Sequence, residues 1–458
     1  MPYKNERASY EPLRRIAENE RVKSLLSNYR VRQRPVDPAA ALKLVDVTTL
    51  PRREWKPDWV LAIDGSYLPV SIQNGYPGAE AAYITVASVM LDAAKMRKLD
   101  QQRPVEPKVF RSTKEAEALD DLLPGRNVVY EDDGSAKVSF RRALFNLLRA
   151  KRMSEHGESL LDTYEVLLQY KPKPQKQDTE QACPYEDCPV DLRYRPQNGT
   201  YQCGCSQKRI MYSVDALRIH ERMNPDTGSN DRIYAEVMQV VERIWVIHIL
   251  RTLEQQRWLS SLKRLAILID GPLAVFGQPA WISQAISTEL KRINGVVRAA
   301  TGEDLLLLGI EKGGEFADHF EYLDQNANGA VGSFPIRTVA LLTDDYIKQN
   351  IYLSDSTKPY GTGTYYGRKF FYKTRSGARI IATLPYLHDD HNDWFRADVS
   401  QFPRLADAAA LLDELISSRF PNSLQPIVAA HAEASIPFTL GKKVLERLAR
   451  DLTMDSRK

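Results

Sequence analysis

Two short apolar runs constrain the fold of this chain most, because each run ends in an aspartate followed by a glycine. The runs are WVLAI at residues 59–63 and LAILI at residues 265–269, and they precede Asp64 and Asp270. An apolar run of this length that stops at a turn is typical of a buried strand. A long helix is expected before the second run, at residues 231–259. Strands mixed with long helices predict an α/β domain.

Other segments extend this pattern. Further strands are predicted at residues 81–91, 305–310 and 338–342, with a hairpin formed by 369–373 and 379–384. Helices are predicted at residues 114–123, 139–153, 405–418 and 441–452. We therefore expect a mixed sheet flanked by helices.

The expected strands and helices divide the chain into four parts. These are an N-terminal helical lead-in at 1–55, a core at 56–95 and 230–440, an insertion at 96–229 and a C-terminal helix at 441–458. The insertion is expected to be helical and to carry all four cysteines.

Composition narrows the class of protein. Lys and Arg number 63 and Asp and Glu 59, a net charge of +4 that is compatible with a nucleic-acid partner only where the positive charge is clustered. No apolar run approaches the ~18 residues of a membrane helix. The N-terminus is polar and lacks the apolar stretch of a signal peptide. A cytoplasmic protein with no membrane contact is expected.

The two Asp-Gly pairs carry the candidate chemistry. Ligands collect at the carboxyl ends of strands in α/β sheets, and carboxylate oxygens suit Mg²⁺ or Mn²⁺. Asp64 and Asp270 on neighbouring strands can therefore hold a divalent metal. Metal bound there can activate water and stabilise the leaving oxygen of a phosphodiester. A strand followed by Asp-Gly is also an ordinary turn, which is the plain alternative.

A third carboxylate is expected from the long helix, and two residues compete for the role. Glu242 has apolar helical neighbours, and an unpaired glutamate is rarely buried without a reason. Glu254 is the rival. A surface ion pair is the alternative for either residue. We favour Glu242.

The four cysteines form a compact cluster of their own. Cys183, Cys188, Cys203 and Cys205 have the spacing C-x4-C, then 14 residues, then C-x-C. Clustered cysteines in a chain of cytoplasmic type favour a tetrahedral zinc site with four cysteine ligands. Such a site leaves no open coordination position, so this Zn²⁺ is expected to be structural, within a zinc-ribbon-like module at residues 183–205. Scattered structural cysteines or a redox pair are the alternatives.

Several motifs together resemble the NurA family of nucleases. They are AIDGS at 62–66, the long helix, LIDGPL at 268–273, GIEKGG at 309–314, LLTDD at 341–345 and PIVAAHAEASI at 426–436. The order and spacing of these motifs carry the resemblance, which covers about residues 55–95 and 230–440.

The resemblance implies an RNase H-like core, a ring-like homodimer, cleavage of DNA with Mn²⁺ or Mg²⁺, and a HerA-type hexameric ATPase as partner. It implies that Asp64, Asp270 and a helix glutamate bind the metal and that His431 lies near it. By itself, a lone histidine in a small apolar segment is usually structural. Lys312 of GIEKGG is either a charge near the scissile phosphate or a solvated turn lysine.

Three functions follow from these observations. The first is a metal-dependent DNA nuclease, an exonuclease, a single-strand endonuclease or both, in DNA repair or in antiphage defence. The second is a non-catalytic adaptor that binds DNA or a translocase through the zinc module. The third is another RNase H-like enzyme, such as a resolvase or an RNA-directed nuclease.

Overall fold

The computed structural model describes residues 10–29, 42–51, 54–72, 78–98, 114–172, 183–185, 188, 196–204, 207–325, 332–389 and 393–435. They belong to two compact units, Met1–Ala41 and Leu42–Lys458. The first unit contains the helices α1 (Glu11–Glu18) and α2 (Glu20–Asn28). The helix predicted at 441–452 lies outside the described residues.

A mixed sheet forms the centre of the second unit. Its strands in order are β1-β9-β10-β11-β8-β7-β2-β3-β4. β2 pairs in parallel with β7, β7 pairs in parallel with β8, and the other pairs are antiparallel. The strands are β1 (Lys43–Asp46), β2 (Trp59–Ser71), β3 (Glu80–Asp92), β4 (Lys114–Pro124), β7 (Leu265–Asp270), β8 (Leu306–Glu311), β9 (Thr338–Leu341), β10 (Gly367–Lys373) and β11 (Arg379–Pro385).

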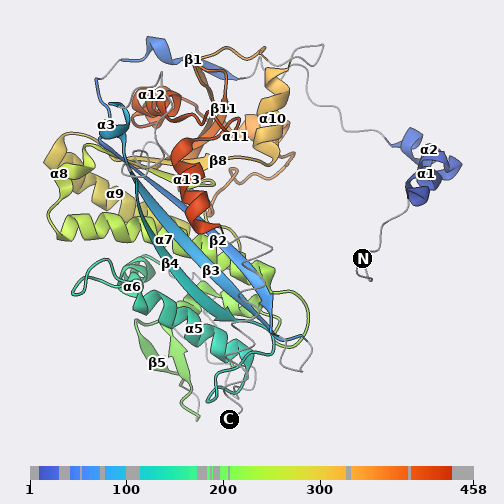
Figure 1. Cartoon of the computed structure of the whole chain (residues 1–458), viewed down its shortest axis with the longest axis vertical. Coiled ribbons are helices and arrows are strands. Elements are labelled where there is room, and N and C mark those ends of the chain that lie inside the picture. Colours follow the sequence, from blue (N-terminus) through green and yellow to red (C-terminus); the bar gives the residue numbers. More distant parts are fainter. Residues whose placement is uncertain are drawn as a thin grey trace. The chain divides into compact units, whose positions relative to one another are not determined.

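Helices cover both faces of this sheet, as predicted (Figure 1). They are α3 (Ala93–Met96), α5 (Ala136–Ala150), α6 (Leu160–Gln169), α7 (Asp231–Gln255), α8 (Leu259–Leu262), α9 (Ile282–Thr301), α10 (Glu315–Asp324), α11 (Asp344–Asn350), α12 (Leu405–Leu415) and α13 (Gln425–Ala434). Short 3-10 turns are η2 (Val47–Thr49), η4 (Ser213–Leu217), η5 (Ile219–Arg222), η6 (Gln278–Trp281) and η8 (Val399–Gln401). None of the helices in the described part of the chain has the length and apolarity that a bilayer crossing needs.

Side chains of β2 alternate between two hydrophobic cores. Val60 and Ala62 belong to the core that includes α12 and α13, whereas Leu61 and Ile63 belong to the core built with α5, α6, α7 and α9. Because successive residues of a strand point to opposite faces, Asp64 is expected on the α13 side, at the level where the apolar stretch ends.

Two predictions about secondary structure are wrong. Residues 114–123 were predicted to be helical, but β4 occupies them as an edge strand paired with β3 from Ala81–Pro124 to Leu91–Lys114. The segment is rich in good helix formers, and pairing along a neighbouring strand overrides that local preference. This strand also lies within the predicted insertion at 96–229, so part of that stretch belongs to the central sheet.

The second error concerns the strand that carries Asp64. It does not stop at the Asp-Gly pair but continues to Ser71, because β3 pairs with it along its whole length, from Trp59–Asp92 to Ser71–Glu80. Asp64 therefore lies in the middle of a strand of 13 residues. In Figure 1, the strands β2, β3 and β4 are the long neighbouring arrows coloured blue to teal.

Candidate active site

Asp64 and Asp270 lie beside each other in the sheet. The parallel pairing of β2 with β7 runs up to Ile63 and Ile269, so the two aspartates are the next residues on adjacent strands. Each of three residues, Asp64, Asp270 and His431, offers one possible ligand atom, and these three atoms lie within 4.8 Å of one another. Two acids about two hundred positions apart in the sequence thus converge on one point.

His431 reaches this point from α13, which lies against β2 and β3. Its Nδ1 and the Oδ2 of Asp64 form a hydrogen bond of 2.8 Å. The Asp64 side chain is 5% exposed, whereas the imidazole of His431 is 58% exposed. The histidine thus connects a buried carboxylate to solvent.

Glu242 is buried on the α7 side of the sheet beside Gly65, and it is not part of the group formed by Asp64, Asp270 and His431. A Cβ atom at Gly65 would lie 2.4 Å from the Oε1 of Glu242, so this carboxylate occupies space that only a glycine leaves open. The missing side chain of Gly65 allows Glu242 to come this close to the strand, and Gly65 does not form a turn.

The charge of Glu242 is partly balanced by Arg243. The Oε2 of Glu242 accepts a hydrogen bond of 2.8 Å from the Nη1 of Arg243. The Nη2 of this arginine donates to the backbone carbonyls of Asp270 and Pro272, at 3.2 and 3.1 Å. Arg243 was missed in the sequence, although an arginine between apolar helix positions needs a buried partner.

The electrostatics of the centre suit a cation. Burial raises the pKa of Asp64 to about 6, with a further increase from the charge of Asp270 and opposing effects of Lys312 and His431. Burial also raises the pKa of Glu242 to about 8, opposed by Arg243 and reinforced by both aspartates. The raised pKa values of Asp64 and Glu242 show that ionisation of these two buried carboxyl groups is costly, and a divalent ion would relieve that cost. Oxygen ligands with one imidazole suit Mn²⁺ or Mg²⁺.

Lys312 and Glu254 have different surroundings. Lys312 follows β8 and places its Nζ 2.8 Å from the Oδ2 of Asp270. Glu254 binds Arg292 through both carboxylate oxygens, at 2.8 and 2.7 Å. It lies twelve residues beyond Glu242, or about 18 Å along the helix axis, away from the aspartates.

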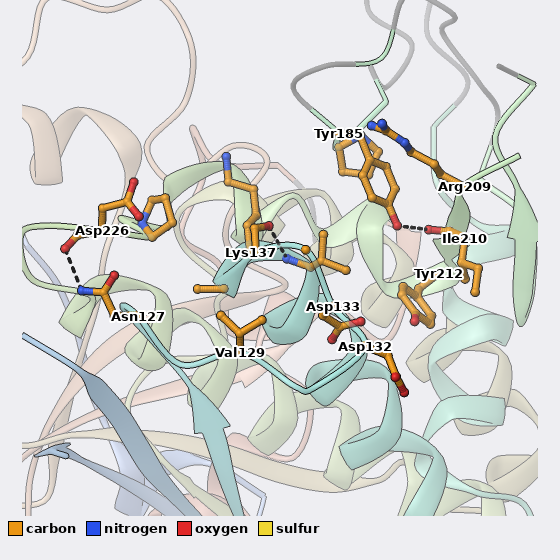
Figure 2. A pocket seen from close by; sticks show the side chains of 16 residues that line it. Asn127, Val129, Asp132, Asp133, Lys137, Tyr185, Arg209, Ile210, Tyr212 and Asp226 are labelled. Carbon is orange, nitrogen blue, oxygen red and sulfur yellow. Dashed lines mark hydrogen bonds between the residues drawn. The ribbon is translucent and has the colours of Figure 1, made fainter. Parts of the chain in front are cut away.

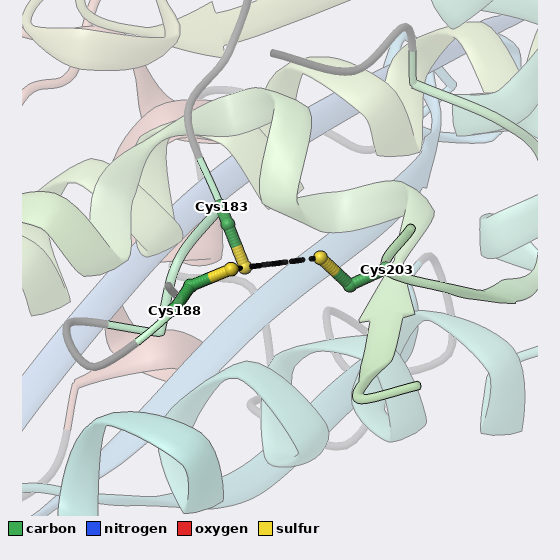
Figure 3. Close-up of side chains that lie close together, drawn as sticks. All are labelled: Cys183, Cys188 and Cys203. Atoms are coloured by element: carbon green, nitrogen blue, oxygen red, sulfur yellow. Dashed lines mark hydrogen bonds between the residues drawn. The ribbon is translucent and has the colours of Figure 1, made fainter. Parts of the chain in front are cut away.

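Three of the four cysteines form a second cluster (Figure 3). The sulfur of Cys203 lies 3.5 Å from that of Cys183 and 3.9 Å from that of Cys188. Tetrahedral Zn–S bonds of about 2.3 Å place sulfurs roughly 3.8 Å apart, so these distances fit a zinc ion. Cys203 follows β5 (Thr200–Gln202), which forms a hairpin with β6 (Ile210–Tyr212). Cys205 lies outside the described residues.

A pocket of about 800 Å³ lies beside the cysteine cluster (Figure 2). Tyr185 and Arg209 line it on one side, and Asp133 and Lys137 near the start of α5 line it on another. No residue of the Asp64–Asp270 centre lines it. Its mixed charges and its separate lining residues set it apart from the candidate active site.

Comparisons with known proteins give one family. The family model of the NurA domain matches residues 59–436. Among solved structures, the crystal structure of the NurA nuclease from Sulfolobus solfataricus is similar at 8% identity and a TM-score of 0.38, with 98% of each chain covered. A crystal structure described as NurA has 10% identity and a TM-score of 0.25, with 96% of this chain and 97% of the other covered. No curated protein matches the sequence significantly.

Proposed function

The chain belongs to the NurA family, and from this premise we propose that it is a metal-dependent deoxyribonuclease with its active site at Asp64 and Asp270. The observation that carries the proposal is the convergence of Asp64, Asp270 and His431 within 4.8 Å, at the point where the β2–β7 pairing ends. The reaction is hydrolysis of a DNA phosphodiester, exonucleolytic, endonucleolytic on single strands, or both.

Each residue of the centre has a distinct role in the proposed reaction. Asp64 and Asp270 would hold Mn²⁺ or Mg²⁺, and Glu242, which lies against Gly65, would add a third carboxylate. The bound ion supplies the positive charge that activates water and stabilises the leaving oxygen. Arg243 holds the Glu242 carboxylate in place through its hydrogen bond of 2.8 Å.

Lys312 and His431 complete the chemistry. Lys312, whose Nζ lies 2.8 Å from the Oδ2 of Asp270, would neutralise the charge of a phosphate oxygen beside the proposed metal site. His431 binds Asp64 through Nδ1 and keeps Nε2 for transfer of a proton to or from solvent. Glu254 has no part in this scheme, since Arg292 engages both of its oxygens.

We also propose a structural Zn²⁺ on Cys183, Cys188, Cys203 and Cys205. The sulfur distances of the first three support it, and Cys205, two positions after Cys203, is the fourth ligand of the proposed site. The expected partners are DNA, a second copy of this chain and a HerA-type hexameric ATPase that feeds DNA to it, in the cytoplasm. Family membership is the support for these partners and for a role in DNA end processing or in defence against foreign DNA.

The proposal is tested by Asp64→Asn and Asp270→Asn in cleavage of linear duplex and single-stranded DNA with Mn²⁺. Both variants are expected to lose cleavage by a factor of about 100 or more, on the order of what a metal-binding carboxylate contributes. Asp389→Asn is the matched control, because the Asp389 side chain is 98% exposed and pairs with Lys291 at the surface. Cleavage at the wild-type rate by both site variants would favour the adaptor function instead.

A further inference from the structure

A row of five contacting aromatic side chains lies next to the segment that follows Asp270; Phe276 is exposed, the three tyrosines are partly exposed, and Phe316 is buried. Neighbouring rings lie 5.3 to 5.8 Å apart between centroids, which is the range of mutual aromatic contact. The members, called the aromatic row below, are Phe276, Tyr365, Tyr360, Tyr352 and Phe316. The proposed chemistry of the carboxylates uses none of them.

The row begins on the segment that directly follows Asp270. The N–H of Val275 donates to the carbonyl of Thr364 at 2.9 Å, and the N–H of Tyr366 donates to the carbonyl of Leu273 at 2.9 Å. The segment after β7 is therefore joined to the segment that carries Tyr365 by backbone hydrogen bonds. The start of the row and the metal-binding carboxylate are parts of one continuous piece of structure.

Phe276 is also fixed to α7 close to Glu242. The N–H of Phe276 donates to the Oε1 of Gln239 at 2.8 Å. Gln239 lies three residues before Glu242, which is one helical turn and places both on neighbouring parts of one helix face. A Cβ at Gly277 would lie 2.3 Å from the Oε1 of Glu236, so the backbone lies directly on the helix.

A buried ion pair packs against two members of the row, Phe316 and Tyr365. Lys369 is 4% exposed and lies 2.8 Å from the Oε1 of Glu311. Its Nζ also lies 3.4 Å from the ring centroid of Phe316 and 3.3 Å from the hydroxyl of Tyr365. Glu311 is the last residue of β8 and directly precedes Lys312, which contacts Asp270. The ion pair packed against the row is therefore one residue away from the candidate active site.

The row is open to a ligand at its catalytic end. Phe276 is 39% exposed, and the three tyrosines are partly exposed. The exposed ring of Phe276 is apolar surface, and a ligand that removed it from water would gain free energy. Unpaired nucleobases stack on exposed aromatic side chains whatever their sequence, so they suit this exposed end of the row.

We propose that the aromatic row is a stacking platform for unpaired bases and that it delivers the single-stranded end of DNA to Asp64 and Asp270. This inference rests on the proposed nuclease function. Bases inside a duplex have no free faces, so the platform discriminates in favour of single-stranded or frayed ends. Phe276 is the contact nearest the scissile phosphate, and the tyrosines hold the bases that follow.

Binding of a fluorescein-labelled single-stranded oligonucleotide of about 20 bases, measured by anisotropy in EDTA to prevent cleavage, tests the platform. Phe276→Ala is expected to weaken this binding roughly tenfold, the effect of losing about one stacked base, and to leave duplex binding within about twofold. Phe276→Trp is expected to restore it. Phe395→Ala is the matched control, because Phe395 is 62% exposed and lies outside the row.

A base analogue reports stacking directly. Fluorescence of 2-aminopurine near the oligonucleotide end is expected to be quenched by the wild type and by Phe276→Trp, and less by Phe276→Ala. Equal single-strand affinity and equal quenching in wild type and Phe276→Ala would overturn the inference, as would a selective loss of protein–protein association. If wild type does not cleave DNA yet Phe276→Ala still weakens single-strand binding, the nuclease function fails while the platform stands.

Discussion

The Nζ of Lys312 lies 2.8 Å from the Oδ2 of Asp270, which gives one carboxylate of the proposed metal site a lysine as its direct neighbour. Asp64 has the imidazole of His431 at the same distance. The two aspartates therefore differ in the group that a metal ion at the proposed site would have to displace.

This relationship predicts how Lys312→Met behaves. The variant is expected to bind Mn²⁺ at least as tightly as wild type, because the competing ammonium is gone. DNA cleavage is expected to fall by roughly 10- to 1,000-fold, the range for removing one charge that stabilises a transition state. Calorimetric Mn²⁺ titration and single-turnover cleavage measure the two effects. Loss of both metal binding and cleavage would show that Lys312 only supports the local structure.

Glu242 and Glu254 form a matched pair for mutation. Glu242→Gln is expected to reduce cleavage about 100-fold or more and to weaken Mn²⁺ binding, since it removes a buried carboxylate beside the aspartates. Glu254→Gln is expected to retain cleavage within about twofold and to lose at most ~1 kcal/mol of stability, as for a partly exposed ion pair with Arg292. Cleavage rates and urea unfolding test both. The opposite ranking would assign the third carboxylate to Glu254.

The glycine at position 65 is expected to be indispensable for a steric reason. In Gly65→Ala the new methyl group would lie 2.4 Å from the Oε1 of Glu242, so the carboxylate must leave its position. We expect cleavage to fall about as far as in Glu242→Gln. Gly134→Ala is the control, because a Cβ there has no atom within 4 Å. Full activity of Gly65→Ala would remove Glu242 from the proposed site.

Stability of the metal-free protein is expected to depend on pH through Glu242. Its pKa is raised from 4.5 to about 8 in the folded chain, so the folded state binds more protons than the unfolded state between these values. Stability must then fall as pH rises from about 5 to 8. Asp64, whose pKa is raised to about 6, also lowers the stability as pH rises, in the more acidic part of this interval. Thermal unfolding in EDTA measures this, and Glu242→Gln should flatten the profile.

Bound divalent metal is expected to reverse this loss of stability with rising pH. Protons compete with Mn²⁺ for the same carboxylates, so affinity for the ion rises with pH over the same interval. Unfolding temperatures with and without Mn²⁺ should therefore diverge toward the upper end of that interval. Parallel curves at all pH values would argue that these carboxylates do not bind the ion.

Substitution of Cys203, a ligand of the proposed zinc site, distinguishes the two proposed metal sites. Cys203→Ser is expected to abolish one Zn²⁺ per chain and to lower the unfolding temperature, because Zn²⁺ at a structural site contributes folding free energy. Mn²⁺ binding at the aspartates should persist, as they belong to a different part of the fold. Elemental analysis and Mn²⁺ titration check this. A zinc-free wild-type protein would contradict the four-cysteine zinc site.

Local sequence patterns predicted the central elements well and the edge of the sheet badly. The apolar runs of β2, β7 and β8 are buried among helices, and burial of this kind produces patterns that can be read without a structure. β4 is mostly exposed, and its backbone pairing with β3, rather than its side chains, decides its conformation. The helix prediction at 114–123 failed for that reason.

The placement of the two aspartates of the candidate site was predictable from the sequence, and that of the residues around them was less so. Asp64 and Asp270 follow apolar runs, and their side-by-side placement comes from the parallel pairing of the two strands. No periodicity distinguishes Glu242 from Glu254 in a helix of 25 residues; the gap at Gly65 and the pairing of Glu254 with Arg292 distinguish them. Such contacts between distant segments leave no local signal.

The uninterrupted course of β2 through Asp64 makes the geometry of the proposed centre a matter of alignment between strands. Inserting or deleting one residue anywhere between Trp59 and Asp64 would rotate the aspartate to the opposite side of the sheet, away from His431, even with every side chain of the centre retained. Engineering of this protein therefore has to preserve the length of these strands as strictly as the identity of the acids.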